Sequence, residues 1–199
     1  MKRNFSSIVL SCLVLGAWSC NDSGTTTSGS GDSATVQQDT IGNANNNTAN
    51  LNATPLSQAD STFVMEAAVG GLTEVESGRV AQQNGMNEGV KSFGQMMITD
   101  HERANSELMS IVSSRGMTPP GTLPADKQKH IDDMKNMKGK AFDNHYVNMM
   151  VNDHQKTIDL FRKQSENGTD PQLKTFATNT LPVLQKHMDS AQALKKRMK

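Results

Sequence analysis

Two copies of one short pattern, each ending in histidine, are the part of this chain best suited to chemistry. They read Met96-Met97-Ile98-Thr99-Asp100-His101 and Met149-Met150-Val151-Asn152-Asp153-His154. Each histidine lies four residues after a methionine, and residues four apart share one face of an α-helix. We therefore predict that His101 and His154 point toward the buried side of their helices, where an imidazole can bind a transition metal or form hydrogen bonds within a core.

One more histidine and one glutamate occupy comparable positions. His187 is in register with the apolar residues of its segment, and Glu74 falls within a stripe of small residues. A rise of about 1.5 Å per residue places Glu74, His101 and His154 in one layer. The same count displaces His187 from His154 by about five residues, or roughly 7 Å.

These four residues form a candidate site for one metal ion, with zinc, copper and iron as the candidates. The side chains expected around the ligands are Asp100, Asp153, Tyr146, Met97 and Met150. Thioethers would favour Cu(I), although methionine also fills irregular cores. The alternative is a buried polar network without metal, in which the two aspartates and Tyr146 join the histidines.

The residue types around the histidines exclude a diiron carboxylate centre. That chemistry needs a glutamate three residues before a histidine. The residues at that position before the five histidines are Ile98, Lys127, Phe142, Val151 and Leu184. No serine or cysteine nucleophile motif is present, which argues against a hydrolase and leaves a non-enzymatic protein as the favoured class. His130 and His145 lie outside the apolar stripes and are predicted to be solvated.

Helical periodicity begins after Pro55 and is interrupted at four places. We predict long helices from Ser57 or Asp60 to about Gln83, from Asn87 to Arg115, from Lys140 to Glu166, and from Asp170 nearly to Lys199. A short helix is expected at 125–136. Pro182 should bend the last helix one turn before His187.

This arrangement predicts an all-α fold. Four long helices with short links in each pair and a long central crossover containing the short helix are typical of a ferritin-like four-helix bundle. The small residues Ala67, Gly71, Gly78 and Ala81 share one side of the first helix and predict a closely packed neighbour there.

The first 19 residues have the anatomy of a secretion signal. Lys2 and Arg3 precede an apolar run that is too short to span a bilayer, and small residues lead to Cys20. The segment Ala17-Trp18-Ser19-Cys20 resembles a lipobox, which predicts lipidation of Cys20; ordinary signal cleavage at the same bond is the alternative. Residues 20–54 are rich in Ser, Thr, Gly and Asn and predict a disordered tether, so the folded domain is expected at 55–199.

The charge balance limits the classes of partner. The chain has 20 basic and 20 acidic residues, and without Lys2 and Arg3 the count is 18 against 20. Nothing in this balance predicts nucleic-acid binding or a polybasic membrane patch, so membrane attachment would rest on lipid at Cys20. The expected location is the cell envelope, as an outer-membrane lipoprotein or in the periplasm. The oligomeric state is not indicated.

From Phe63 to the C-terminus, the chain resembles a bacterial family of ferritin-like domains of unknown function described as predicted outer-membrane proteins. The residues that carry the resemblance are Glu74-Val75-Glu76, Asp100-His101, Phe142-Asp143, Tyr146, Asp153-His154, Asp170-Pro171 and Leu181-Pro182 followed by His187. The resemblance implies a ferritin-like bundle and an envelope location, but no activity. An alternative function is therefore a structural or interaction protein of the envelope that binds another envelope protein and no metal.

Overall fold

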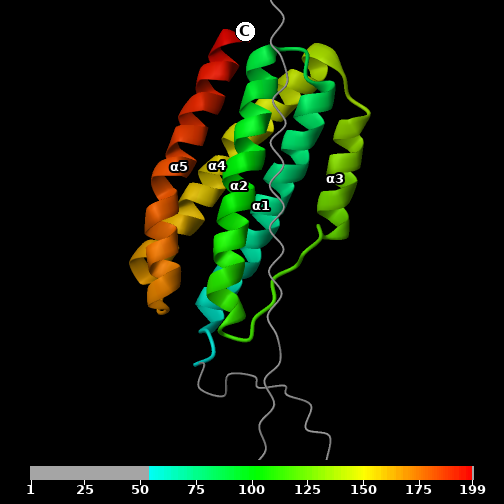
Figure 1. The fold of residues 1–199 in the computed structure, drawn as a ribbon. Coiled ribbons are helices and arrows are strands. Elements are labelled where there is room, and N and C mark those ends of the chain that lie inside the picture. Colours follow the sequence, from blue (N-terminus) through cyan, green and yellow to red (C-terminus); the bar gives the residue numbers. More distant parts are fainter. Residues whose placement is uncertain (1–53, 199) are drawn as a thin grey trace, which may run out of the picture. The chain divides into compact units, whose positions relative to one another are not determined.

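The computed structural model describes residues 54–198, and within this range the ordered elements are all helical (Figure 1). The helices are α1 (Gln58–Asn84), α2 (Glu88–Ser113), α3 (Ala125–Lys135), α4 (Gly139–Asn167) and α5 (Pro171–Arg197). No strand occurs among these residues. The predicted all-α bundle, with one short helix in the central crossover, is confirmed. The predicted signal segment, Cys20 and residues 20–53 of the predicted tether lie outside the described residues.

Three of the four long helices, α1, α2 and α5, begin where a side chain satisfies free backbone N–H groups. Ser57 accepts a hydrogen bond from the N–H of Asp60, and Asn87 accepts one from Gly89. Asp170 accepts from the N–H groups of both Gln172 and Leu173, and Pro171 occupies the first position of α5. Such caps fix the helix starts, and the starts fix the level at which each side chain lies in the bundle.

The four long helices form two antiparallel pairs. α1 packs mainly on α2, and α4 packs mainly on α5; α1 also contacts α4, and α2 contacts α5. Figure 1 shows that α2 and α4 run in the same direction, because the crossover containing α3 returns the chain to the end of the bundle at which α2 begins. All four neighbouring pairs are therefore antiparallel, and α3 packs against α1 on the outside.

Two apolar clusters fill the interior. The first contains Phe63, Leu108, Ile158, Phe176 and Leu184 among others, and the second contains Val80, Met97, Met150, Tyr146 and Ala191 among others. On each long helix, a buried titratable residue lies near the boundary between the two clusters: Glu74, His101, His154 and His187. All four side chains are buried. A polar layer thus divides the core at mid-height.

α1 and α2 approach closely at glycines. A Cβ atom built on Gly78 would lie 2.7 Å from the carbonyl oxygen of Gly94, and one on Gly94 would lie 2.9 Å from the Cβ of Ala81. A side chain at either position would force the helices apart. The close packing predicted from the small residues of the first helix is confirmed.

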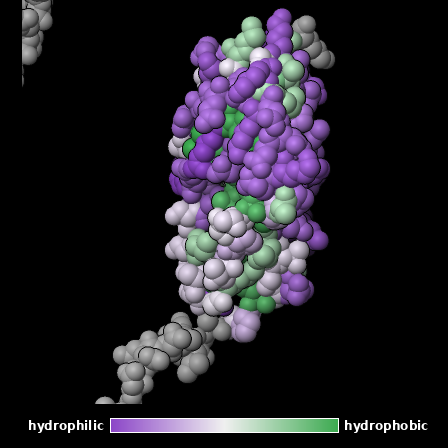
Figure 2. Space-filling model, turned by 90° about the vertical axis from the view of Figure 1, so that its right-hand side faces the viewer, coloured by the Kyte–Doolittle hydropathy of each residue, from purple (hydrophilic) through white to green (hydrophobic). Residues whose placement is uncertain are grey.

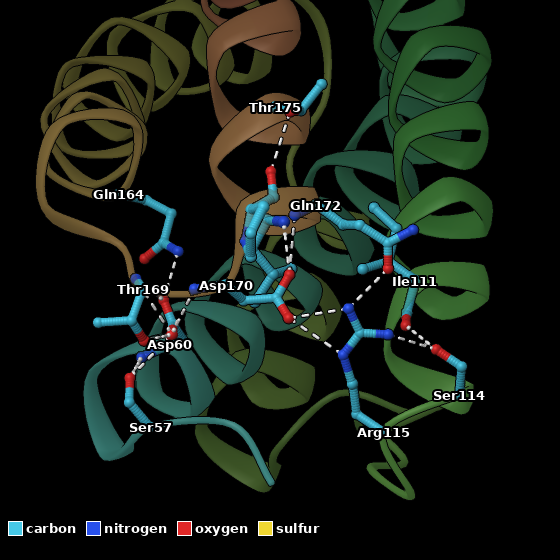
Figure 3. Close-up of polar contacts among 12 residues, drawn as sticks. Ser57, Asp60, Ile111, Ser114, Arg115, Gln164, Thr169, Asp170, Gln172 and Thr175 are labelled. Carbon is cyan, nitrogen blue, oxygen red and sulfur yellow. Dashed lines mark hydrogen bonds and ion pairs between the residues drawn. The ribbon is translucent and has the colours of Figure 1, made fainter. Parts of the chain in front are cut away.

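A polar cluster at one end of the bundle joins the start of α1 to the turn between α4 and α5 (Figure 3). Asp60 is fully buried and accepts hydrogen bonds from the Gln164 side chain at 2.6 Å, from the Thr169 side chain and backbone, and from the Ser57 hydroxyl at 2.8 Å. Burial alone would raise the pKa of Asp60, but these hydrogen bonds bring it down to about 2. The carboxylate therefore stays charged while holding this end together.

The surface on the side of α3 has two parts. Figure 2 shows hydrophilic residues over the upper half of this face, and paler residues with hydrophobic patches over the lower half. No helix in the described range has both the length and the apolar character needed to cross a membrane.

Candidate metal centre

His154 on α4 and His187 on α5 face each other inside the polar layer. The Nε2 atom of His154 lies 3.2 Å from the Nδ1 atom of His187, and both side chains are fully buried. Two ring nitrogens at this distance must either share a proton or present lone pairs to a common cation. The other nitrogen of each ring decides between these states.

The two outer ring nitrogens, His154 Nδ1 and His187 Nε2, both face hydrogen-bond acceptors. His154 Nδ1 lies 3.0 Å from the carbonyl oxygen of Met150, which can only accept, so this nitrogen must carry the hydrogen. His187 Nε2 lies 3.0 Å from Oδ2 of Asp100, and it donates to that carboxylate. In the neutral form of each ring, the two inner nitrogens, His154 Nε2 and His187 Nδ1, therefore carry a lone pair and no hydrogen.

The surroundings keep these rings neutral. Burial, and secondarily the charge that His187 would carry, lowers the pKa of His154 to about 4. Burial also lowers the pKa of His187, although its hydrogen bond to Asp100 opposes this. At neutral pH a shared proton is thus disfavoured, and two lone pairs 3.2 Å apart repel each other unless a metal cation lies between them.

His101 on α2 completes a cluster of three imidazoles. One ligand nitrogen from each of His101, His154 and His187 can be chosen so that all three lie within 4.8 Å of one another. The His101 ring centre is 5.3 Å from that of His187 and 5.8 Å from that of His154. Burial and the two neighbouring histidines hold the pKa of His101 well below its usual value, so this ring is also neutral and able to bind a metal.

Glu74 on α1 lies against two of the histidines without forming a hydrogen bond to either. Its Oε2 is 3.2 Å from His101 Nε2, and its Oε1 is 3.4 Å from His154 Nδ1. Both carboxylate oxygens and His101 Nε2 are buried and lack a hydrogen-bond partner. Burial, with a smaller effect from the charge of Asp153, raises the pKa of Glu74 to about 8.

The Tyr146 hydroxyl is a fourth buried atom of this region without a partner. Burial raises the pKa of Tyr146, and the charge of Glu74 raises it further. Buried polar atoms are nearly always hydrogen-bonded, so unpaired ones mark strain or the place of a water or an ion. Four such atoms on Glu74, His101 and Tyr146 make this layer the part of the described core in which hydrogen bonding is least satisfied.

Space and access exist on the Glu74 side. A cavity of about 20 Å³ touches Glu74, His101 and Asn105, which is enough for about one water molecule. A larger groove of about 470 Å³ between α1 and α4 reaches Glu74 from the surface, past Thr73 and Asp153. The groove therefore ends at the Glu74 side of the polar layer, and none of the three histidines lines it.

The residues present fit a metal ion. In a tetrahedral zinc site with Zn–N bonds of about 2.0–2.1 Å, two ligand nitrogens lie roughly 3.3 Å apart. The observed separation between His154 and His187 is 3.2 Å. The Asp100–His187 hydrogen bond is also the arrangement that orients a ligating imidazole and raises its basicity.

The predicted displacement of His187 by roughly 7 Å is wrong, because its ring meets that of His154 directly. Helical side chains tilt toward the N-terminus of their own helix. In the antiparallel pair, His187 tilts toward the α4–α5 link and His154 tilts away from it, so the two rings converge. A count of residues along each helix gives only the level of the Cα atoms, so it does not predict that the two rings converge.

Some of the residues predicted around the ligands contact a histidine, and others do not. Asp100 bonds His187, and Met150 contributes its carbonyl to His154. The Asp153 side chain is 38% exposed and pairs with Lys156, while its charge acts on Glu74, so its place in the network stays a prediction. Met97 is buried in the apolar core.

His130 and His145, which are predicted to be solvated, are only partly exposed. Both are half-buried, their ring centres are 5.4 Å apart, and His130 Nε2 lies 3.0 Å from the sulfur of Met149. Helical spacing carries no signal for this contact, because it depends on how α3 docks beside α4.

Comparison with known proteins identifies a family and a related fold. The model of a family described as "Domain of unknown function (DUF4142)" matches residues 45–194, three quarters of the chain. A crystal structure of a DUF305 fragment from Deinococcus radiodurans matches with a TM-score of 0.63 at 8% identity, covering 72% of this chain and 99% of that one. At that identity the likeness shows the fold alone.

No curated protein matches the chain. The expected relation to a family of unknown function is confirmed, whereas its ferritin-like and outer-membrane descriptions stay predictions.

Proposed function

The chain belongs to the DUF4142 family, and we propose that this member binds one transition-metal ion through His101, His154 and His187, with Glu74 beside it. The observation that carries the proposal is the pair of inner nitrogens 3.2 Å apart, each left with a lone pair because the outer nitrogen donates to Met150 or Asp100. Zinc, copper and iron all accept imidazole ligands.

Glu74 supports the same proposal from the other side of the cluster. Its unpaired carboxylate can supply a fourth ligand or hold a metal-bound water in the adjoining cavity. A metal ion would also stabilise the charged form of this carboxylate, which burial otherwise disfavours.

The direct test is a metal titration of the chelator-treated full chain, with Zn²⁺ competing against a chromogenic chelator. Wild type should bind one ion at this site and melt at a higher temperature when loaded. The double variant His154→Gln and His187→Gln should lose that ion and the associated rise in melting temperature. Unchanged binding and melting in a folded double variant would contradict the proposal and favour a structural polar layer.

The two copies of the repeated pattern, which end in Asp100-His101 and Asp153-His154, provide one test variant and one control variant. Asp100 bonds a ligand whereas Asp153, at the same position of the other copy, is partly exposed and pairs with Lys156. Asp100→Ala should weaken metal binding by about 10- to 100-fold, and Asp153→Ala should change it much less. Equal effects of the two substitutions would indicate that the hydrogen bond to His187 has no role.

We further propose that the domain is exported and held at a membrane of the cell envelope by lipid on Cys20. The lipobox-like segment before Cys20 and the polar composition of residues 20–54 support this proposal.

A further inference from the structure

A second group of metal-binding side chains lies on the outside of the bundle, between α3 and α4. His130 comes from α3, and His145 and Met149 come from α4, where they share one face because they are four residues apart. The two ring centres are 5.4 Å apart, and the Met149 sulfur lies 3.0 Å from His130 Nε2. Two imidazoles and one thioether thus meet at one place.

The hydrogen bonding of this group is incomplete. His145 Nε2 is enclosed but has no partner, and it is the one unpartnered buried side-chain atom in residues 54–198 outside Glu74, His101 and Tyr146. A thioether is only a weak acceptor, so Met149 is a poor partner for the His130 ring. Burial, with a smaller effect from His130, lowers the pKa of His145, which leaves its lone pair free.

The positions of these side chains are fixed by the packing of α3. Ile131, which follows His130, and Met134 are fully buried in the core. The Asn84 amide at the end of α1 donates to the carbonyl oxygens of Lys135 and Met137, each at 3.0 Å. His130 is therefore held beside α4 in a partly exposed position.

We propose that His130, His145 and Met149 bind one Cu(I) ion. A thioether is a soft donor that selects Cu(I), and imidazole also suits copper, whereas this group contains no carboxylate for a harder ion. The histidines of the polar layer show no contact to a methionine sulfur among the hydrogen bonds of residues 54–198, so the two sites differ in chemistry. This second site is independent of the proposed function of the first.

The test uses the full chain with Cys12→Ser and Cys20→Ser, so that no thiol competes, and with His154→Gln and His187→Gln, so that the first site is removed. Under anaerobic conditions, Cu(I) is titrated against a chromogenic Cu(I) chelator. We expect one bound Cu(I) per chain. Adding His145→Gln and Met149→Leu should abolish it or weaken binding at least about 10-fold, and Met109→Leu, which alters an exposed methionine, should not. Equal binding in all three folded proteins overturns the proposal.

A spectroscopic measurement covers the case in which the background variant does not fold. In the chain with only the two cysteines replaced, Ag(I) serves as a substitute for Cu(I) that air does not oxidise. The ring signals of His130 and His145 and the methyl signal of Met149 should shift on adding Ag(I). Shifts confined to other histidines and methionines would overturn the proposal.

Discussion

The buried polar groups of this bundle are unevenly satisfied, and the unsatisfied ones coincide with its histidines. Asp60 has several donors, and His187 and His154 each have one good partner for an outer nitrogen. Glu74 has none, although its side chain is only 4% exposed. A buried carboxylate without a partner lowers stability, so its presence is better explained by binding than by packing.

The substitution Glu74→Gln distinguishes a role of this carboxylate in metal binding from a role in packing. In chelator at pH 9, above the raised pKa of Glu74, the variant should be more stable than wild type by about 1–3 kcal/mol, because an unpaired buried charge is replaced by a neutral group of similar shape. Its affinity for Zn²⁺ should fall by about 10-fold or more. Chemical denaturation and metal titration measure the two effects. A variant less stable than wild type, with unchanged affinity, would mean that Glu74 serves the fold alone.

Asp60 gives the pH dependence of stability. Its pKa is lowered to about 2 in the folded chain from an ordinary value of 3.8, so it stabilises the fold above about pH 4, and this contribution is lost as the pH falls toward 2. Asp60→Asn should lower the free energy of unfolding by about 1–2 kcal/mol at pH 7, and the difference from wild type should shrink between about pH 4 and pH 2. Denaturant unfolding across this range measures it.

The exposed Asp126 provides the control for the Asp60 variant. Asp126→Asn should leave the unfolding free energy nearly unchanged at every pH. A constant difference between wild type and Asp60→Asn from pH 7 to pH 2 would contradict the assigned role of the Asp60 carboxylate.

At the scale of helices, the contact between α1 and α2 depends on glycine. Gly78→Ala should destabilise the protein by about 1–3 kcal/mol, because the added methyl group would meet the Gly94 carbonyl. Gly70→Ala is the matched control on the same helix. A methyl group at Gly70 would have no neighbouring atom within 4 Å, so alanine should stabilise the helix by up to about 1 kcal/mol. Thermal unfolding compares them, and equal effects of the two substitutions would contradict the close approach.

The helices could be predicted from the sequence because their ends carry local signals. Ser57, Asn87 and Asp170 are capping residues, and each long helix starts within a residue or two of its predicted position. The inward faces of Glu74, His101, His154 and His187 followed from helical spacing. What could not be predicted is relative placement: the level of His187 depends on side-chain tilt across two antiparallel helices, and the His130–His145 contact depends on the docking of α3.

For the whole molecule, the main prediction outside the described residues concerns attachment. Cys20→Ser should move the protein from the membrane fraction to the soluble fraction and leave its circular dichroism unchanged, because serine cannot carry the lipid that we propose as the anchor. Fractionation and labelled palmitate uptake measure this. A Cys20→Ser protein that still sediments with membranes, together with a wild type that takes up no palmitate, would contradict the lipoprotein proposal.

Binding of one metal ion by three imidazoles from three helices has its own spectroscopic signature. X-ray absorption at the zinc edge, on untagged protein loaded with one equivalent of Zn²⁺, reports the ligand atoms themselves. We predict about three imidazole nitrogens at roughly 2.0–2.1 Å, and their loss in the His154→Gln and His187→Gln variant. A wild-type spectrum showing only water-like oxygen neighbours, or one unchanged by the double substitution, would contradict the proposed metal centre.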